Sequence, residues 1–195
     1  MPKSTITAQR RNKNVTEDLY DQPGHLIRRA HQIAASLFVQ HVGKGVTPIQ
    51  YAILRMVHEK PGIDQGGLAR SIALDTSTTA MAAARLEEKG LLKRLVVETN
   101  RRQLELHLTQ AGEDLLRNLV SGVHTMRAQL LSSLEPREQQ QFMGLLRKFV
   151  QLNNDQSRAP LQTKEPSAAI NAPRLWVTSK KATALARSTA HRAPR

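Results

Sequence analysis

The stretch DTSTTAMAAARLEEKG, residues 75–90, has the composition of a helix made of two unlike halves. Its first turn, residues 76–79, consists only of threonine and serine, which are mediocre helix formers, and Asp75 is placed to cap it. Alanines and one methionine follow, and then a charged run that Gly90 can end. The start of this helix therefore presents short hydroxyls and methyl groups where a buried helix would carry bulky apolar side chains.

Two helices are expected before this stretch. Residues 47–60 start with a capping box at Thr47 and stop at Pro61, which cannot continue a helix. Asp64 can then cap a second, short helix that ends before residue 75. Because only a few residues separate this helix from the next, the pattern predicts a helix-turn-helix.

A hairpin is expected directly after Gly90. Residues 91–98 and 103–109 have the apolar composition and alternation of strands, and residues 99–102 form a short polar turn between them. A helix-turn-helix followed by a hairpin is a winged helix-turn-helix, whose second helix enters the major groove of DNA. The expected fold class is mainly α with a small β-hairpin wing.

Further helices are expected on both sides of this unit. Residues 25–42 have helical apolar spacing, Thr109 can cap a long helix, and Glu135 with Pro136 can open a last one. These helices carry more apolar surface than one small winged helix covers, so we expect N- and C-terminal dimerisation helices. The residues expected to be buried between protomers are Leu37, Phe38, Leu130, Leu131, Phe142 and Leu146.

Net charge is concentrated at the two ends of the chain. Of the formal +13, residues 1–15 carry +4 and residues 156–195 carry +7, which leaves +2 for the 140 residues between them. The ends lack sustained periodicity, so we expect a flexible basic arm (1–20) and a basic, mostly disordered tail (156–195). The predicted folded domain, 21–155, divides into a DNA-binding lobe (47–109) and dimerisation helices (21–46 and 110–155).

The sequence gives no indication of an enzyme. It contains no cysteine, no glycine-rich phosphate loop, no metal-binding HExxH pattern and no nucleophile elbow, so we expect no catalytic residues, no metal and no cofactor. His41 and His58 lie near helix ends, where a histidine more often caps or meets solvent than binds a metal. No apolar run is long enough for a membrane span and no secretory signal is recognisable, so a cytoplasmic location is expected.

The hydroxyl-rich start of the helix suits a groove-facing position. Short hydroxyls reach phosphates or base edges, and methyl groups contact thymine. Arginines at the hairpin tip suit a narrow minor groove, whose negative potential attracts them. The alternative interpretations are an ordinary capped surface helix and a solvated basic turn. The residues predicted to contact DNA are Gln65, Thr76, Ser77, Thr78, Met81, Arg85, Arg101 and Arg102.

The central part of the chain resembles the MarR family of regulators. The matching pieces are TPIQYAIL (47–54), LARSIALDTSTT (68–79), RLEEKGLLKR (85–94), the NRR (100–102) of the hairpin and LTQAG (108–112), and the resemblance extends over about residues 20–152. It implies a homodimer that binds a palindromic operator in double-stranded DNA and is released by a small ligand. The chain departs from the family at Asn100, where the wing usually has an aspartate, and at Thr76 and Met81, where arginines are frequent.

PGHLIRRAHQI (23–33) followed by TPIQYA (47–52) resembles a subgroup of this family, the NicR/BpsR repressors of nicotinate catabolism. That likeness implies a small aromatic carboxylate as effector, such as 6-hydroxynicotinate. A polar helix face beside the apolar one can line its pocket, since arginine donates two parallel hydrogen bonds to a carboxylate. Solvation of the arginines, or pairing with acids such as Glu17, is the alternative. The residues predicted to bind the ligand are His25, Arg28, Arg29, Gln32 and Tyr51.

The alternative function is that of a ligand-independent DNA-binding or architectural protein that uses its basic ends. Such a protein binds DNA of any sequence, with a steep dependence on salt. A specific regulator instead has a large ratio of operator to random-DNA affinity, which survives deletion of residues 156–195.

Overall fold

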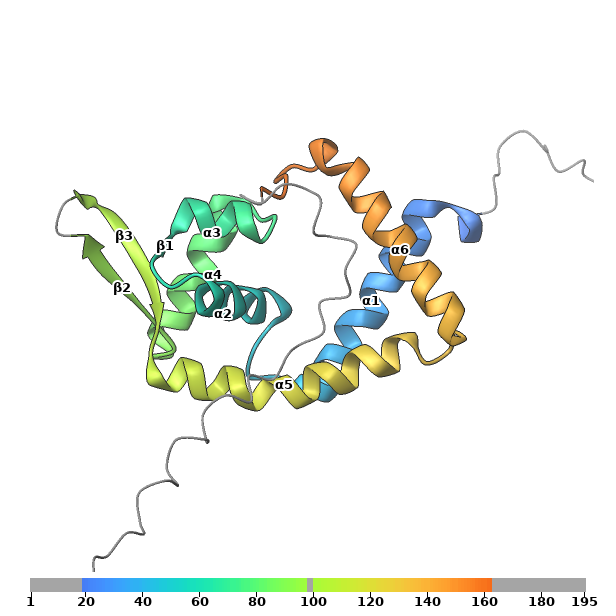
Figure 1. Cartoon of the computed structure of the whole chain (residues 1–195), viewed down its shortest axis with the longest axis horizontal. Coiled ribbons are helices and arrows are strands. Elements are labelled where there is room, and N and C mark those ends of the chain that lie inside the picture. The colour runs from blue at the N-terminus through green and yellow to red at the C-terminus, as the bar shows by residue number, and fades with distance from the viewer. Residues whose placement is uncertain (1–18, 98–99, 163–195) are drawn as a thin grey trace, which may run out of the picture. The chain divides into compact units, whose positions relative to one another are not determined.

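A computed structural model describes residues 19–97 and 100–162; of residues 97 and 100–103 it describes the backbone. Its helices are α1 (Pro23–Val42), α2 (Pro48–Glu59), α3 (Gln65–Ser71), α4 (Thr76–Glu88), α5 (Gln110–Leu131) and α6 (Pro136–Leu152). Its strands are β1 (Ile63–Asp64), β2 (Leu92–Val97) and β3 (Asn100–Leu108), and short 3-10 helices, η1 (Leu19–Asp21) and η2 (Asn154–Gln156), flank α1 and α6. The expected fold class, mainly α with a small β wing, is confirmed (Figure 1).

Helix starts follow the predicted caps. The Thr47 hydroxyl accepts from the Gln50 backbone N–H at 3.2 Å, and the Gln50 side chain accepts from the Thr47 N–H at 3.1 Å. Asp64 accepts from the Gly67 N–H, and the Thr109 hydroxyl accepts from the Gly112 N–H. Each side chain accepts a hydrogen bond from a backbone N–H that the first turn of a helix leaves free. This is why single polar residues were enough to predict where these helices start.

The sheet differs from the expected two-stranded hairpin. It has three antiparallel strands in the order β1-β3-β2, because the chain between α2 and α3 adds Ile63 opposite Leu106. The hairpin turn expected at residues 99–102 is also wrong: β3 already begins at Asn100, which pairs with Val97 across an irregularity in the ladder. The polar residues 100–103 have no apolar alternation, so the sequence carries no strand signal there.

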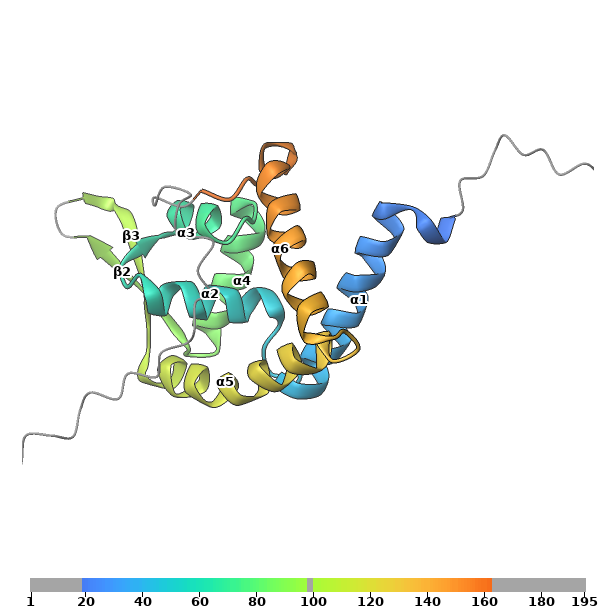
Figure 2. The same cartoon turned by 45° about the vertical axis from the view of Figure 1, so that its right-hand side comes forward.

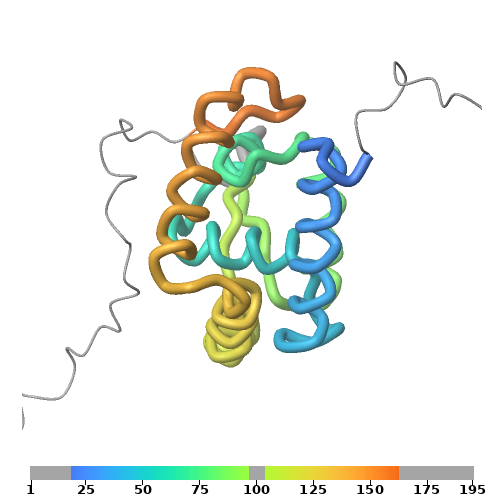
Figure 3. The backbone as a smooth tube through the Cα atoms, turned by 90° about the vertical axis from the view of Figure 1, so that its right-hand side faces the viewer, coloured from blue at the N-terminus to red at the C-terminus, as the bar shows by residue number. Residues whose placement is uncertain are grey.

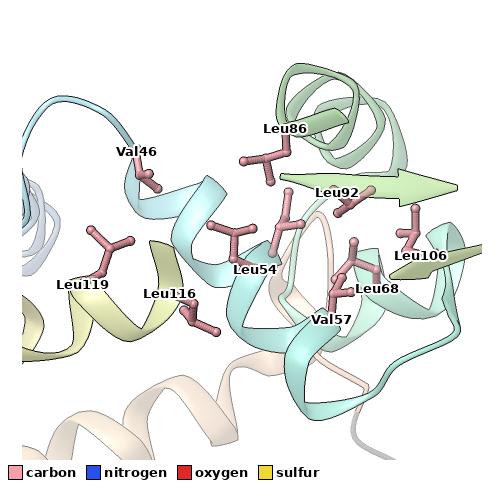
Figure 4. Packing of buried hydrophobic residues seen from close by; sticks show 10 residues of the cluster. Val46, Leu54, Val57, Leu68, Leu86, Leu92, Leu106, Leu116 and Leu119 are labelled. Atoms are coloured by element: carbon pink, nitrogen blue, oxygen red, sulfur yellow. The ribbon is translucent and has the colours of Figure 1, made fainter. Parts of the chain in front are cut away.

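One apolar core joins α2, α3, α4, the sheet and the first half of α5 (Figure 4). Ile53, Leu54, Leu68, Leu86 and Leu106 are fully shielded from solvent. These residues come from three helices and β3, so no single element of this lobe can shift without opening the core. The lobe is therefore a rigid platform that fixes the direction of α4 relative to the hairpin.

At two glycines, helix α5 comes very close to the backbone of other segments of the chain. A Cβ at Gly112 would lie 2.1 Å from the carbonyl oxygen of Leu91, at the root of the hairpin. A Cβ at Gly122 would lie 2.3 Å from the carbonyl oxygen of His41, near the end of α1. Figure 1 shows α5 running from the hairpin to α1. Only glycine permits these approaches, so α5 is fastened to both the core lobe and α1.

The far end of α5 carries two helices with exposed apolar faces. Seen along α5, α1 and α6 rise on different sides (Figure 3), and both lie at the end of α5 away from the hairpin (Figure 2). Within one chain, no residue of helix α6 is buried, and its apolar side chains are open to solvent: Leu145 is 68% exposed and Leu152 is 72% exposed. Of the residues expected between protomers, Phe38 and Leu131 are instead already buried within one chain, and Phe142 and Leu146 are exposed.

The described chain continues beyond residue 156, the predicted start of the tail. The Asn154 side chain both accepts from the Leu161 N–H and donates to the Leu161 carbonyl. The Gln162 N–H donates to the carbonyl of Arg70 at the end of α3. The segment after α6 is therefore attached to the core lobe as far as residue 162. The predictions for residues 1–18 and 163–195 lie outside the described residues.

Replacing Gly122 with alanine tests the contact between α5 and α1. Alanine ordinarily stabilises a helix relative to glycine by about 1 kcal/mol. Here the added methyl meets the His41 carbonyl, so we expect the free energy of unfolding to fall by about 1–3 kcal/mol. Urea unfolding measures it, and Ser121→Ala, at the exposed neighbouring position, is the control that should not destabilise. Equal stability of the two variants would contradict the close approach.

Candidate functional site

The core lobe fixes α4 through its buried side and its C-terminal end. Thr79, Ala83 and Leu86 form its buried side, and the Thr79 hydroxyl donates back to the Asp75 carbonyl at 2.9 Å. At the other end, the Lys89 ammonium donates to the carbonyl of Gly45 at 2.9 Å. Nothing in the charged run had singled out Lys89 for this role, because its partner is a backbone carbonyl distant in sequence.

The opposite side of α4 is the outward face, formed by Ser77, Met81, Arg85 and Glu88. Residues at this spacing share one side of a helix. All four are exposed, and Met81 is 58% exposed although its side chain is apolar. The predicted contacts Ser77, Met81 and Arg85 therefore lie together, whereas Thr76 is exposed at the first turn and Thr78 is half-buried. This arrangement suits a helix that presents one face to a broad partner.

Asp75 organises the hydroxyls at the start of α4. Its carboxylate accepts from the Ser77 hydroxyl at 2.6 Å, from the Thr78 hydroxyl at 2.7 Å and from the Thr78 N–H at 2.8 Å. The hydrogen bond from the Ser77 side chain and those from Thr78 hold the pKa of the Asp75 carboxyl well below its usual range. The sequence predicted the cap, but not that the same carboxylate would accept hydrogen bonds from two hydroxyls.

The other predicted DNA contacts lie on the hairpin and on α3. Arg101 and Arg102 are in β3, between Asn100, which pairs with Val97, and Leu104, which pairs with Val96. Gln65 is the first residue of α3 and is half-buried beside the capping Asp64. Glu87 of α4 forms an ion pair with Arg94 of β2 at 3.1 Å, which fastens the hairpin to α4. The two elements predicted to meet DNA are thus connected directly.

Three of the five predicted ligand-binding residues meet on α1. Arg28 donates to the Gln32 side chain at 3.1 Å and to Nδ1 of His25 at 3.3 Å. Because a guanidinium only donates, Nδ1 accepts and the ring proton of His25 lies on Nε2. That Nε2 is shielded from solvent and has no hydrogen-bond partner among the described residues. Arg29 is exposed.

Tyr51 lies apart from this cluster. Its ring contacts that of Phe38 edge-on, with the centroids 6.1 Å apart. Phe38 follows His25 by 13 positions on α1, which is about 20 Å along a helix. Tyr51 is half-buried; burial raises the pKa of its hydroxyl, nearby Arg55 opposes this and Glu59 adds to it. Within one chain the structure therefore does not bring Tyr51 to His25 and Arg28.

Two further histidines contact side chains of α5. His58 at the end of α2 contacts Glu113 of α5 at 2.8 Å, and His41 of α1 contacts Gln129 of α5. In the described parts of the chain, no three His, Asp or Glu side chains are grouped closely enough to hold a metal ion. Within residues 19–97 and 100–162, no helix is long and apolar enough to cross a bilayer.

Comparison with known proteins gives consistent similarities. The MarR family pattern matches residues 46–104. A putative transcriptional regulatory protein for the hcr operon of Thauera aromatica is 30% identical over 144 residues, 73% of this chain and 85% of that protein. The PcaV transcriptional regulator from Streptomyces coelicolor, in complex with its natural ligand, superimposes with a TM-score of 0.66 at 33% identity, over 70% of this chain and 96% of that one.

A third similarity is to BpsR of Bordetella bronchiseptica, whose DNA binding is regulated by 6-hydroxynicotinic acid. It superimposes with a TM-score of 0.61 at 26% identity and covers 65% of this chain and 96% of that chain.

The hydrogen bonds of Asp75 predict a dependence of stability on pH. Its pKa is lower in the folded chain than the ordinary value of 3.8, so its stabilising effect is complete above about pH 4 and is lost as the pH falls below that. We expect Asp75→Asn to reduce the free energy of unfolding more at pH 7 than at pH 3. Urea unfolding at both values measures this; a reduction that does not change with pH would contradict the ionised network.

Proposed function

Because this chain belongs to the MarR family, and is a transcriptional regulator of that type, we propose that it is a repressor released by a small aromatic carboxylate. It binds a palindromic operator as a homodimer, with α4 of each protomer in the major groove and the β2–β3 hairpin over the adjacent minor groove. The observation that carries this proposal is the outward face of α4. An exposed face at the middle of a helix whose other side and C-terminal end are fixed is preorganised for a large, flat partner.

Dimerisation explains the apolar surface at the far end of α5. Helix α6 exposes Leu145, Phe149 and Val150 along one chain, and α1 exposes Ile27 and Ile33. Exposed side chains of this size, on two helices at the same end of α5, are typical of an interface. A second copy offers the same apolar helices, and a two-fold pair of α4 helices matches the symmetry of a palindromic operator.

The effector proposal rests on the α1 cluster. The shielded Nε2–H of His25 has no acceptor among the described residues, and Arg28 beside it carries a guanidinium suited to a carboxylate. A planar hydroxylated aromatic acid such as 6-hydroxynicotinate supplies an acceptor for the histidine and a carboxylate for Arg28 or Arg29. The likeness to BpsR, 26% identical, supports this ligand class. Tyr51 completes such a site only if the dimer brings α2 of one protomer near α1 of the other.

Release follows from the spacing of the two α4 helices. A ligand shifts the equilibrium only by its difference in affinity between the two arrangements of the dimer. A ligand seated on α1 is coupled to the DNA-binding lobe through α5, which contacts α1 near His41 and the hairpin root near Leu91. A coupling of about 1–3 kcal/mol lowers operator affinity by roughly 5- to 150-fold.

The dimer is tested on α6. Leu145→Glu places a charge on the exposed apolar face, so we expect sedimentation velocity at micromolar concentration to show a monomer where the unaltered protein is a dimer. Gln140→Glu, an exposed polar position on the other side of the same helix with the same charge change, is the control and should stay dimeric. A folded monomer of the unaltered protein would overturn the dimer.

The hairpin is tested by Arg102→Ala and Arg101→Ala. An arginine inserted in the minor groove is worth about 1–3 kcal/mol, so we expect at least one variant to weaken operator binding by that amount. Arg147→Ala removes the same charge from α6 and should leave affinity nearly unchanged. If neither hairpin variant differs from this control in a gel-shift titration, the assignment of the wing is incorrect.

The effector is tested by His25→Ala and Arg29→Ala. Operator affinity is measured with and without 6-hydroxynicotinate. We expect both variants to bind operator normally but to need a higher ligand concentration for release, because each loses a polar contact to the acid. Gln40→Ala, exposed further along α1, is the control. If both variants are released from operator at the same ligand concentration as the unaltered protein, the pocket lies elsewhere. If no hydroxylated aromatic acid releases the unaltered protein, the effector proposal is wrong.

A further inference from the structure

Met81 is an apolar side chain that the fold leaves in solvent. It lies in the middle of the outward face of α4, is 58% exposed, and has only alanines as neighbours at positions 80 and 82–84. A methionine turned toward the core would gain free energy by burial, and here that gain requires a partner surface. A thioether is flexible and polarisable, which suits contact with a methyl group.

Ser77 lies one helical turn before Met81 on the same face. Its hydroxyl donates its single proton to Asp75 at 2.6 Å, so only oxygen lone pairs remain for a partner. The ionised Asp75 adds negative charge beside it. Of the outward face, Arg85 alone carries a side-chain N–H donor, and it lies a further turn along the helix. The first half of this face therefore offers a hydrogen-bond acceptor and an apolar contact, but no donor.

Base pairs differ in what they present to such a surface. In the major groove, adenine has an N6 amino donor and thymine has a C5-methyl group, whereas guanine has two acceptors, N7 and O6. Cytosine has an amino donor, but its pair has no methyl group. An acceptor next to an apolar side chain thus matches both features of an A·T pair, and lone pairs beside a carboxylate repel the acceptors of guanine.

From this match we propose that Ser77 and Met81 select A·T in each operator half-site, Ser77 accepting from adenine N6 and Met81 contacting the thymine methyl. The two positions are about 6 Å apart along the helix axis, so they face the same base pair or adjacent ones. Asp75 is the positioning residue, since it decides which way the serine proton points. This inference rests on the proposed entry of α4 into the major groove.

The Met81 contact is tested by selecting duplexes from a random pool with the full chain and with Met81→Ala. The base pair whose preference disappears in the variant is the pair under Met81, and we expect it to be T·A. Replacing that thymine by uracil removes only the methyl group and should weaken binding of the unaltered protein about fourfold. Met81→Ala should not respond to uracil, whereas Ile49→Ala, which loses an exposed apolar side chain of α2, should respond fully.

The Asp75 role is tested by two variants that both keep a helix cap. Asparagine retains an oxygen for the Ser77 proton, whereas serine in the same place frees that proton to donate to guanine. We expect Asp75→Asn to keep the preference for adenine over guanine under Ser77, and Asp75→Ser to reduce it at least threefold. Thermal unfolding of both variants shows that each is folded.

The outcomes separate the readout from the function. Any of three results overturns the readout but leaves a specific regulator. They are enrichment of one half-site with G·C under these residues, an unchanged affinity for the uracil duplex, and identical base preferences of the two Asp75 variants. Enrichment of no sequence at all overturns both the specific operator and the readout.

Discussion

The close approach of α5 to backbone at two glycines is the constraint on which the arrangement of this protein depends. At Gly112 the helix lies against the Leu91 carbonyl, and at Gly122 against the His41 carbonyl. Side-chain packing tolerates small adjustments, but a backbone-to-backbone approach that no Cβ fits does not. Helix α5 therefore transmits the position of α1 to the root of the hairpin, and α4 follows because Glu87 holds Arg94 on β2.

At the start of α4, one carboxylate both caps the helix and accepts hydrogen bonds from two hydroxyl groups. Asp75 satisfies a free backbone donor of the first turn, and it also accepts hydrogen bonds from the hydroxyls of the exposed Ser77 and the half-buried Thr78. Capping requires only an acceptor, which serine or asparagine supplies as well. The negative charge and the second carboxylate oxygen are what give the surface its polarity, so the choice among capping residues carries chemical information beyond helix stability.

The single chain is incomplete at its other end. No residue of helix α6 is buried within one chain. The predicted ligand residues also fall into two groups: Tyr51 of α2 contacts Phe38 of α1, whereas His25, Arg28 and Gln32 lie together nearer the start of α1. Both features have the same physical origin: surfaces on α1 and α6 that one chain leaves uncovered. The proposed dimer would cover α6 with a second apolar surface, and the proposed effector site needs a second α2 at the polar end of α1. Both proposals therefore depend on the same helices.

The sequence by itself determined the elements whose signals are local. Helix starts were predicted from single capping residues, because a cap needs only a side chain and a backbone donor three residues away; these residues are Thr47, Asp64, Asp75 and Thr109. Apolar spacing then identified the buried faces of α2, α4 and α5. The outward positions of Ser77, Met81 and Arg85 followed from the same periodicity. What only the tertiary structure decided depends on partners distant along the chain. Strand β1 exists because Ile63 meets Leu106, β3 begins at Asn100 because backbone pairing with Val97 ignores side-chain polarity, and the Lys89 ammonium finds the Gly45 carbonyl. Helical periodicity predicted that Ser77 faces outward, but it did not predict which acceptor its hydroxyl donates to. That depends on where the folded chain places the Asp75 carboxylate.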